Sequence, residues 1–213
     1  MASGRERSGR GSNKRERILS AAVKVFARSG FYNAKISEIA REAGVADGTI
    51  YLYFDGKDNL LISAFEDRMK WLIERLQGEL KTVSGGPLDK MRECIRLHLS
   101  VAVEAPDLAE FITVELRQSS KFVKEYDNPG FMEYLGILRD IFVEGQKAGV
   151  FRADLDPRLT IRMVFGALDE VMLILALSRH KVAETGIDHH VDQVEKLLID
   201  GLLAPQPEGP SQA

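Results

Sequence analysis

From Asp58 to the C-terminus, apolar residues recur at helical spacing, and no run alternates between apolar and polar residues as a strand would. Asp156 and Pro157 should begin one of these helices, because Asp is a favoured N-cap and Pro suits the first helical turn. Breaks that contain Gly, Pro or Asn divide this part into six predicted helices, at about 58–82, 88–104, 106–127, 131–148, 157–180 and 188–203.

The segment before residue 58 predicts a smaller unit of three helices. Apolar residues at positions 18, 22, 25 and 26 lie on one helical face, and Gly30 is expected to end this first helix. Two shorter helices follow, at about 37–43 and 48–54. The predicted fold class is therefore all-α, with an N-terminal three-helix headpiece and a C-terminal six-helix domain.

The two short helices and the tight turn between them are typical of a DNA-binding helix-turn-helix. Ser37 and Asp47 are expected to cap the two helices, and Gly44 to take the positive φ that ends the first one. The second helix of such a motif enters the major groove with its N-terminal residues toward the bases. The residues predicted to contact bases or phosphates are small, hydroxyl-bearing or basic: Lys35, Ser37, Gly48, Thr49, Tyr51, Tyr53 and Lys57.

The alternative for this segment is a buried helical hairpin whose tyrosines belong to the core, but that leaves the small and hydroxyl residues at the helix start unexplained. Residues 14–60 resemble the N-terminal domain of TetR-family transcriptional regulators. Three segments carry this resemblance: Ala-Ala-Val-Lys-Val-Phe-Ala-Arg-Ser-Gly-Phe, the helix-turn-helix motif itself, and Lys-Asp-Asn-Leu-Leu. The run from Val45 to Phe54 is especially similar to the FadR-type members, which respond to acyl-CoA and repress fatty-acid degradation in bacteria. Asp47 departs from the basic or neutral residue of many relatives, and we assign it to capping.

The resemblance extends to Glu115-Leu-Arg-Gln-Ser119 and Phe165-Gly-Ala-Leu-Asp-Glu170, and it implies a tunnel for an acyl chain in the C-terminal domain. Core filling would explain the aromatic residues equally well. Arg117 is expected to pair with Asp169 or Glu170, since a buried charge is costly when unpaired; contact with the polar part of a ligand is the alternative. The candidate ligand-binding residues are Phe111, Arg117, Phe142, Phe165 and Asp169.

The fifth predicted helix contains seven consecutive apolar residues, Val171 to Leu177, so it should bury more than one side. Asp169 and Glu170 interrupt the apolar stretch well short of the ~20 residues that a bilayer requires. We therefore expect a homodimer built by the last two helices, as in TetR relatives, which would present two reading helices to a palindromic operator. The alternative is that these are core helices of a monomer. The predicted interface residues are Val171, Leu175, Val191, Val194, Leu198 and Leu202.

Charge divides the chain in the same place as the helix pattern. Residues 1–57 hold 11 Lys and Arg against 6 Asp and Glu, net +5, and the other 156 residues hold 18 against 26, net −8, which sums to −3. The basic end is the expected DNA-facing end. Residues 1–13 are predicted to be a disordered basic arm without the apolar block of a secretory signal, which favours a cytoplasmic location. Residues 205–213 are predicted to be a disordered tail.

Cys94 is the only cysteine, so neither an intrachain disulfide nor a cysteine-rich metal site is expected. The adjacent His189 and His190 would point in different directions on a helix, so a histidine metal site is not expected either. No glycine-rich phosphate loop, nucleophile elbow or HExxH motif occurs in the sequence, so an enzyme is not expected.

The sequence thus predicts a homodimeric repressor of fatty-acid metabolism genes, with no cofactor, that binds double-stranded operator DNA and is released by long-chain acyl-CoA. One alternative is the same kind of repressor with another hydrophobic effector, such as a drug or an aromatic metabolite. The other alternative is a helical acyl-CoA-binding protein or enzyme without DNA function.

Overall fold

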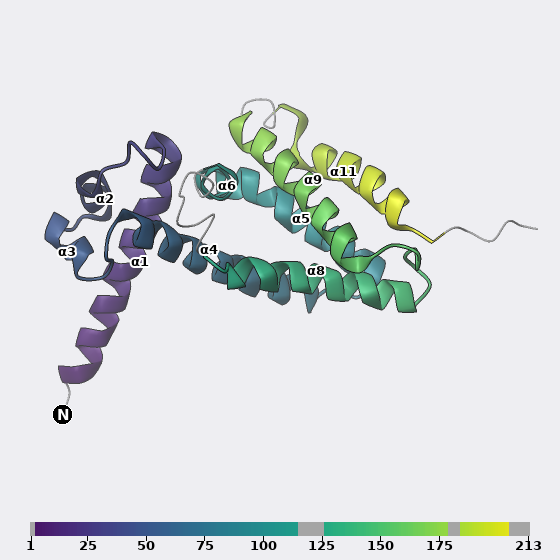
Figure 1. Cartoon of the computed structure of the whole chain (residues 1–213), viewed down its shortest axis with the longest axis horizontal. Helices are drawn as coiled ribbons and strands as arrows, with labels where there is room; N and C mark the ends of the chain where they lie inside the picture. Colours follow the sequence, from purple (N-terminus) through teal and green to yellow (C-terminus); the bar gives the residue numbers. More distant parts are fainter. Residues whose placement is uncertain (1–2, 115–125, 179–183, 205–213) are drawn as a thin grey trace, which may run out of the picture.

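The computed structural model describes residues 3–114, 126–178 and 184–204, and within them all regular elements are helices. Figure 1 shows a headpiece of α1 (Ser3–Ser29), α2 (Ile36–Ala43) and α3 (Asp47–Tyr51), from which α4 (Lys57–Leu80) leads into the larger domain. That domain adds five more described helices: α5 (Pro87–Glu104), α6 (Pro106–Thr113), α8 (Pro129–Lys147), α9 (Pro157–Leu177) and α11 (Ile187–Leu202). The all-α prediction is confirmed.

Most predicted helix ends agree with the structure because local chemistry sets them. Asp156 caps α9 by accepting a hydrogen bond from the Leu159 amide at 2.7 Å, with Pro157 in the first turn. Gly44 ends α2 with φ of 64°, and Arg17 donates to the carbonyl oxygens of Ala43 and Gly44 beyond the last turn. The third predicted helix begins at Pro106 as expected, but residues 115–125 lie outside the described residues.

The predicted starts of both helices in the motif agree with the structure within one residue, but both predicted caps are wrong. Ser37 lies inside α2, whose N-cap is Lys35, and the Lys35 amide donates to the Glu38 carboxylate at 3.3 Å. Asp47 is the first residue of α3, and the N-cap is Ala46, with no side-chain hydrogen bond. Ile39 and Ala40 of α2 and Ile50 of α3 are buried, and α2 packs extensively on α1. Tertiary packing can override a local preference, so the nearest capping residue falls inside each helix. α3 is also shorter than predicted and ends at Tyr51.

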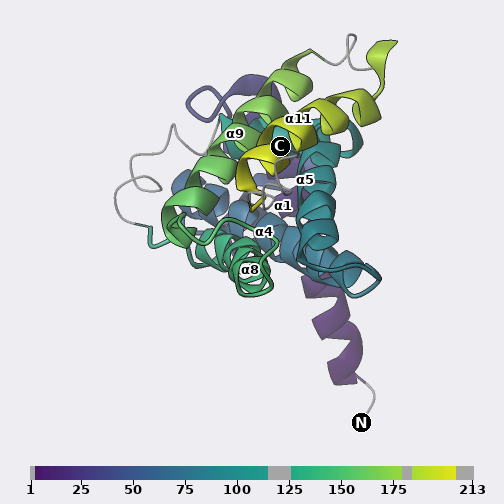
Figure 2. The ribbon, with the colours of Figure 1, turned by 90° about the vertical axis from the view of Figure 1, so that its right-hand side faces the viewer.

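The predicted disordered arm is helical from Ser3 onward, as a continuation of α1. The buried face of α1 begins at Ile18 and Leu19, so the core nucleates the helix there. Extending an existing helix costs little, because each added residue gains one backbone hydrogen bond. In both views the N-terminal half of α1 projects away from the rest of the molecule (Figures 1 and 2). The predicted tail, residues 205–213, lies outside the described residues.

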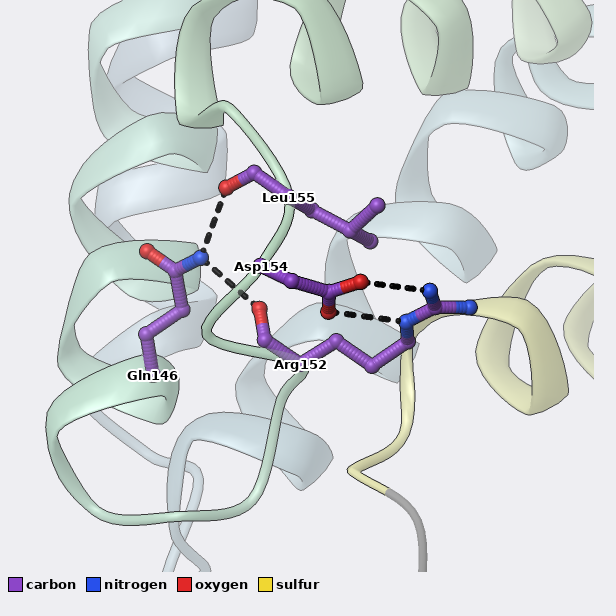
Figure 3. A network of polar contacts seen from close by, with 4 residues as sticks. All are labelled: Gln146, Arg152, Asp154 and Leu155. Atoms are coloured by element: carbon purple, nitrogen blue, oxygen red, sulfur yellow. Dashed lines mark hydrogen bonds and ion pairs between the residues drawn. The ribbon is translucent and has the colours of Figure 1, made fainter.

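The loop between α8 and α9 is held by a polar network (Figure 3). Gln146 donates to the carbonyl oxygens of Arg152 and Leu155 at 2.8 and 2.9 Å, and Arg152 makes a two-point ion pair with Asp154. The Arg152 amide also donates to the Leu202 carbonyl at 2.9 Å, which joins this loop to the end of α11. The loop therefore sets the position of both α9 and α11, which lie on the side away from α4 in Figures 1 and 2.

Candidate functional site

The N-terminal candidate site is the exposed side of α3. Ile50 and Phe54 are buried as predicted, and Val45 packs against the core between the two helices of the motif. Their burial turns the rest of α3 outward, so Gly48 is open to solvent and Tyr51 is 60% exposed. Among the described residues, the N-terminal end of this short helix is left uncovered, as reading of a groove requires.

The other predicted DNA-contacting residues lie around this helix. Lys35 and Ser37 are exposed at the start of α2, and Thr49 and Tyr53 are half-buried. Lys57 has a role that the sequence did not indicate: its Nζ donates to the carbonyl oxygens of Tyr32 and Ala34 at 3.0 and 3.3 Å. In this structure the Lys57 ammonium group therefore closes the loop between α1 and α2.

A second candidate site is a partly open cavity of about 260 Å³ in the larger domain, lined by residues of five helices. Its wall is mostly apolar, with Met69, Leu72 and Leu76 from α4 facing Val101 of α5 and Met172 of α9. Phe165 lines it as well and packs against Phe131 with ring centroids 4.8 Å apart. The polar groups that reach the wall are few: Arg75, His98, Asn128, Tyr134 and Asp169. A largely apolar hollow with a few polar groups is typical of a small-molecule site.

Two of the predicted ligand-binding residues, Phe165 and Asp169, line this cavity, and two others do not. Phe111 is stacked on Phe26 of α1, with ring centroids 6.1 Å apart, and Phe142 is stacked on Phe151 near the end of α8. These two aromatic residues therefore belong to the hydrophobic core, which is the alternative given above for the aromatic residues. Arg117 lies outside the described residues, and so does its predicted pairing. Glu170 is exposed on the surface of α9 rather than buried.

The polar pair formed by His98 and Tyr134 was not predicted from the sequence. His98 Nδ1 and the Tyr134 hydroxyl oxygen are 2.9 Å apart, and both side chains are buried. Burial lowers the pKa of His98 to about 4 and raises the pKa of Tyr134 well above its usual value, so both groups are neutral near pH 7. The signal available in the sequence was a histidine on the same helical face as Cys94 and Val101, which are both buried.

At the edge of the cavity, Arg75 and Glu104 form a two-point ion pair with nitrogen–oxygen distances of 2.6 and 3.0 Å. This hydrogen bonding raises the pKa of Arg75 and lowers that of Glu104. Glu104 is the last residue of α5, directly before α6 begins at Pro106. The pair therefore joins the cavity wall to the start of α6.

One turn of α6 touches both the cavity and the headpiece. Ile112 lines the cavity, while the preceding residue, Phe111, is fully buried against Phe26 of α1. α6 packs extensively on both α1 and α9. A second connection runs from α4, where Arg68 donates to the Ser20 hydroxyl of α1 at 2.9 Å. The cavity wall is thus connected through α6 and α4 to α1 of the headpiece, so a movement of the wall can be transmitted to α1.

The six predicted dimer-interface residues all lie against the core of the protomer to some degree. Leu175, Val191 and Leu202 are buried within the protomer, while Val171, Val194 and Leu198 are partly buried against the same core. The exposed apolar residues of these helices are different ones: Leu159, Met163, Ile174 and Leu177 on α9 and Leu197 on α11. Because α9 is apolar on nearly every face, the sequence pattern alone could not assign its outward face.

Comparison with known proteins shows the family to which the chain belongs. The model of bacterial regulatory proteins of the tetR family matches residues 18–64, and that of the YsiA-like protein C-terminal region matches residues 65–201. The chain belongs to the TetR family. It is 36% identical over 185 residues to the fatty acid metabolism regulator protein of Bacillus subtilis (strain 168). The aligned region covers 87% of this chain and 93% of that protein.

Two solved structures of the family are similar over nearly their whole length. The transcriptional regulator FadR from Bacillus subtilis, in complex with stearoyl-CoA, superimposes with a TM-score of 0.79 at 35% identity, covering 87% of this chain and 98% of that chain. The fatty acid degradation regulator FadR from Bacillus halodurans gives a TM-score of 0.77 at 34% identity, covering 88% and 98%. This TetR-family chain is thus a FadR-like DNA-binding regulator and not an enzyme, and α2 with α3 is its helix-turn-helix.

Two further findings concern the described residues of this TetR-family member. Within residues 3–114, 126–178 and 184–204, no helix has the length and apolar character needed to cross a membrane. In that same part of the chain, no three His, Cys, Asp or Glu side chains are grouped so that they could hold a metal ion.

Proposed function

We propose that this chain is a homodimeric repressor of fatty-acid metabolism genes, which binds a palindromic operator and is released from it by long-chain acyl-CoA. The carrying observation is the apolar cavity between α4, α5, α6, α8 and α9, in a chain similar to a regulator crystallised with stearoyl-CoA. An apolar wall with few polar groups suits an alkyl chain, whose burial contributes about 0.8 kcal/mol per CH₂ group.

The proposed release depends on the contacts between α6, α4 and the headpiece. A chain that enters the cavity beside Ile112 would displace α6 and, through the stacked rings of Phe111 and Phe26, rotate α1. The two reading helices of a dimer must match consecutive major-groove half-sites, so a small rotation of each headpiece weakens operator binding. A coupling free energy of about 1–3 kcal/mol corresponds to a change of roughly 5- to 150-fold in affinity.

We assign the dimer interface to the exposed apolar stripe of α9, continued by Leu197 of α11, rather than to the buried residues of these helices. Met163 is 67% exposed and Ile174 is 53% exposed, and Gly166, Ala167 and Glu170 lie between them on the same exposed face. Ile174→Glu should therefore give a folded monomer in sedimentation and a large loss of operator affinity. The matched control is Val103→Glu, since Val103 is 49% exposed on α5 and belongs to no proposed interface. A dimeric Ile174→Glu protein would contradict the assignment.

The proposed DNA contacts divide into base and phosphate contacts. Thr49→Ala should remove discrimination at one base pair by about 1–3 kcal/mol, whereas Tyr51→Phe should weaken binding to all sequences alike. Tyr126→Phe is a matched control, because Tyr126 lies in the C-terminal domain and donates to Glu66 at 3.0 Å. Unchanged operator affinity of both headpiece variants at moderate salt would contradict the proposed reading helix.

The deciding experiment measures operator affinity at fixed salt, with DNA from the gene's own upstream region, without and with C12 to C18 acyl-CoA. Release by long-chain acyl-CoA, but not by free coenzyme A, is the expected result. By linkage, operator DNA must weaken acyl-CoA binding by the same factor. Tight operator binding that no acyl-CoA changes would keep the DNA-binding regulator and reject the effector. A thermal-shift panel that includes drugs and aromatic metabolites would then identify the alternative effector.

A further inference from the structure

In the described part of the chain, one buried polar atom in the cavity wall has no hydrogen-bond partner. His98 is 8% exposed, and its Nε2 makes no hydrogen bond within the described structure, although its Nδ1 is bonded to Tyr134. A buried polar group without a partner is destabilising, and such groups are rare in folded proteins. The position of this one beside an otherwise apolar cavity indicates that its partner is supplied by a ligand.

The bond to Tyr134 determines which kind of partner fits. Among the described residues, His98 Nδ1 is the one hydrogen-bond partner of the Tyr134 hydroxyl, and burial keeps that hydroxyl protonated. If the hydroxyl donates to Nδ1, then Nε2 carries the hydrogen and is the single unpaired group. If Nδ1 donates instead, both the hydroxyl hydrogen and the Nε2 lone pair are left unpaired. The first arrangement leaves fewer buried groups unsatisfied, so Nε2–H is a donor.

We infer that His98 Nε2–H donates a hydrogen bond to the thioester carbonyl oxygen of the bound acyl chain, and that Tyr134 holds the imidazole in the tautomer that this requires. The inference rests on the proposed acyl-CoA effector and adds the group that distinguishes an acyl thioester from other long-chain molecules. A neutral carbonyl needs one donor, whereas the carboxylate of a free fatty acid would lose far more hydration free energy than one neutral donor returns. The site thus selects the activated acyl ester over the free acid.

Access to Nε2 involves Phe165. The Phe165 ring packs at 90° to the imidazole, with centroids 5.5 Å apart, and it also lines the cavity. In this structure Nε2 is shielded from solvent. A chain that enters against Phe165 turns this ring and exposes the donor, so carbonyl recognition follows entry of the chain.

The test uses two ligands that differ at one atom pair. Palmitoyl-CoA carries the carbonyl, and S-hexadecyl-CoA, a thioether with the same chain length, lacks it. The affinity of full-length protein for each is measured by calorimetry for the natural chain and for His98→Leu, which removes the donor at similar volume. The natural chain should prefer the thioester by about tenfold, and His98→Leu should bind both ligands equally. His98→Gln, which places an amide N–H near the Nε2 position, should restore part of the preference.

A structural role alone would predict another pattern. If His98 only filled the core, His98→Leu would change the affinity for the two ligands by the same factor, and that result would overturn the inference. Free His98→Leu protein should unfold close to the temperature of the natural chain, because the change removes the unpaired Nε2–H but leaves the buried Tyr134 hydroxyl without its partner among the described residues. If neither ligand binds the natural chain, the proposed effector fails. If both bind the natural chain with equal affinity, only the assignment of His98 fails.

Discussion

The headpiece and the C-terminal domain both have interiors built from aliphatic and aromatic side chains, but the C-terminal domain leaves part of its interior unfilled. The headpiece core is filled, with Ile18, Phe26, Ile39 and Ile50 fully buried, and its candidate functional groups lie on the outside of α3. The C-terminal domain contains a partly open cavity, and its candidate functional groups, including His98, line that cavity. DNA reading requires a rigid surface whose groups are fixed before binding, whereas ligand sensing requires a core that a ligand can complete.

The two regions meet at the stacked rings of Phe26 and Phe111, so the largest expected effect is at that contact. Phe26→Ala should cost about 3–5 kcal/mol in the free energy of unfolding, because it leaves a void at a fully buried aromatic position. Urea unfolding followed by circular dichroism measures this cost. Tyr32→Ala is the control, since Tyr32 is an exposed aromatic residue of the same headpiece. A cost below about 1 kcal/mol for Phe26→Ala would mean that the regions do not share a core here.

One substitution placed twice on α4 tests the contrast between a filled and a hollow interior. Leu61 is fully buried and does not line the cavity, so Leu61→Phe should be overpacked and cost about 1–3 kcal/mol. Leu72 lines the cavity, so Leu72→Phe should place its ring in open space at a cost below about 1 kcal/mol. Leu72→Phe should also reduce the thermal stabilisation by palmitoyl-CoA. Equal destabilisation by the two changes would remove the contrast.

The buried histidine predicts a pH dependence that comes from the C-terminal domain alone. In the folded chain the pKa of His98 is lowered to about 4 from an ordinary value of 6.5. As pH falls below 6.5 the unfolded state takes up a proton that the folded state does not, so stability decreases through this window. Between pH 7.5 and pH 5 the loss should be roughly 2 kcal/mol. Denaturation curves of the natural chain and of His98→Leu at both pH values measure this loss, which should be larger by this amount in the natural chain. An equal loss of unfolding free energy in both proteins would show that His98 does not titrate as its burial requires.

The smallest expected effects concern helix caps. Asp156→Ala should cost about 1 kcal/mol, since it removes the side-chain hydrogen bond to the first turn of α9. In the headpiece, Ser37→Ala and Asp47→Ala should each change stability by no more than about 0.5 kcal/mol, because neither residue caps its helix. Thermal unfolding at pH 7 compares the three. A Ser37→Ala cost as large as that of Asp156→Ala would favour the capping role that the sequence predicted.

Local chemistry made much of the fold predictable from the sequence. Pro157 after Asp156 begins α9, Gly44 ends α2, and the apolar spacing of Ile50 and Phe54 identified the buried side of the motif. In each case the decisive atoms lie within a few residues of one another, so composition and spacing suffice. The family resemblance of the headpiece was recognisable for the same reason, since its motif is one short continuous segment.

The sequence by itself therefore determined the all-helical class, most helix ends and the DNA-reading motif. Only the tertiary structure decided which residues line the cavity, because that wall joins five helices and separates neighbours such as Phe111 and Ile112. The same holds for the pairing of His98 with Tyr134, which are 36 positions apart. The outward face of α9 also required the structure: a helix that is apolar all round has no periodic signal to orient it, and its neighbours alone decide which residues stay exposed.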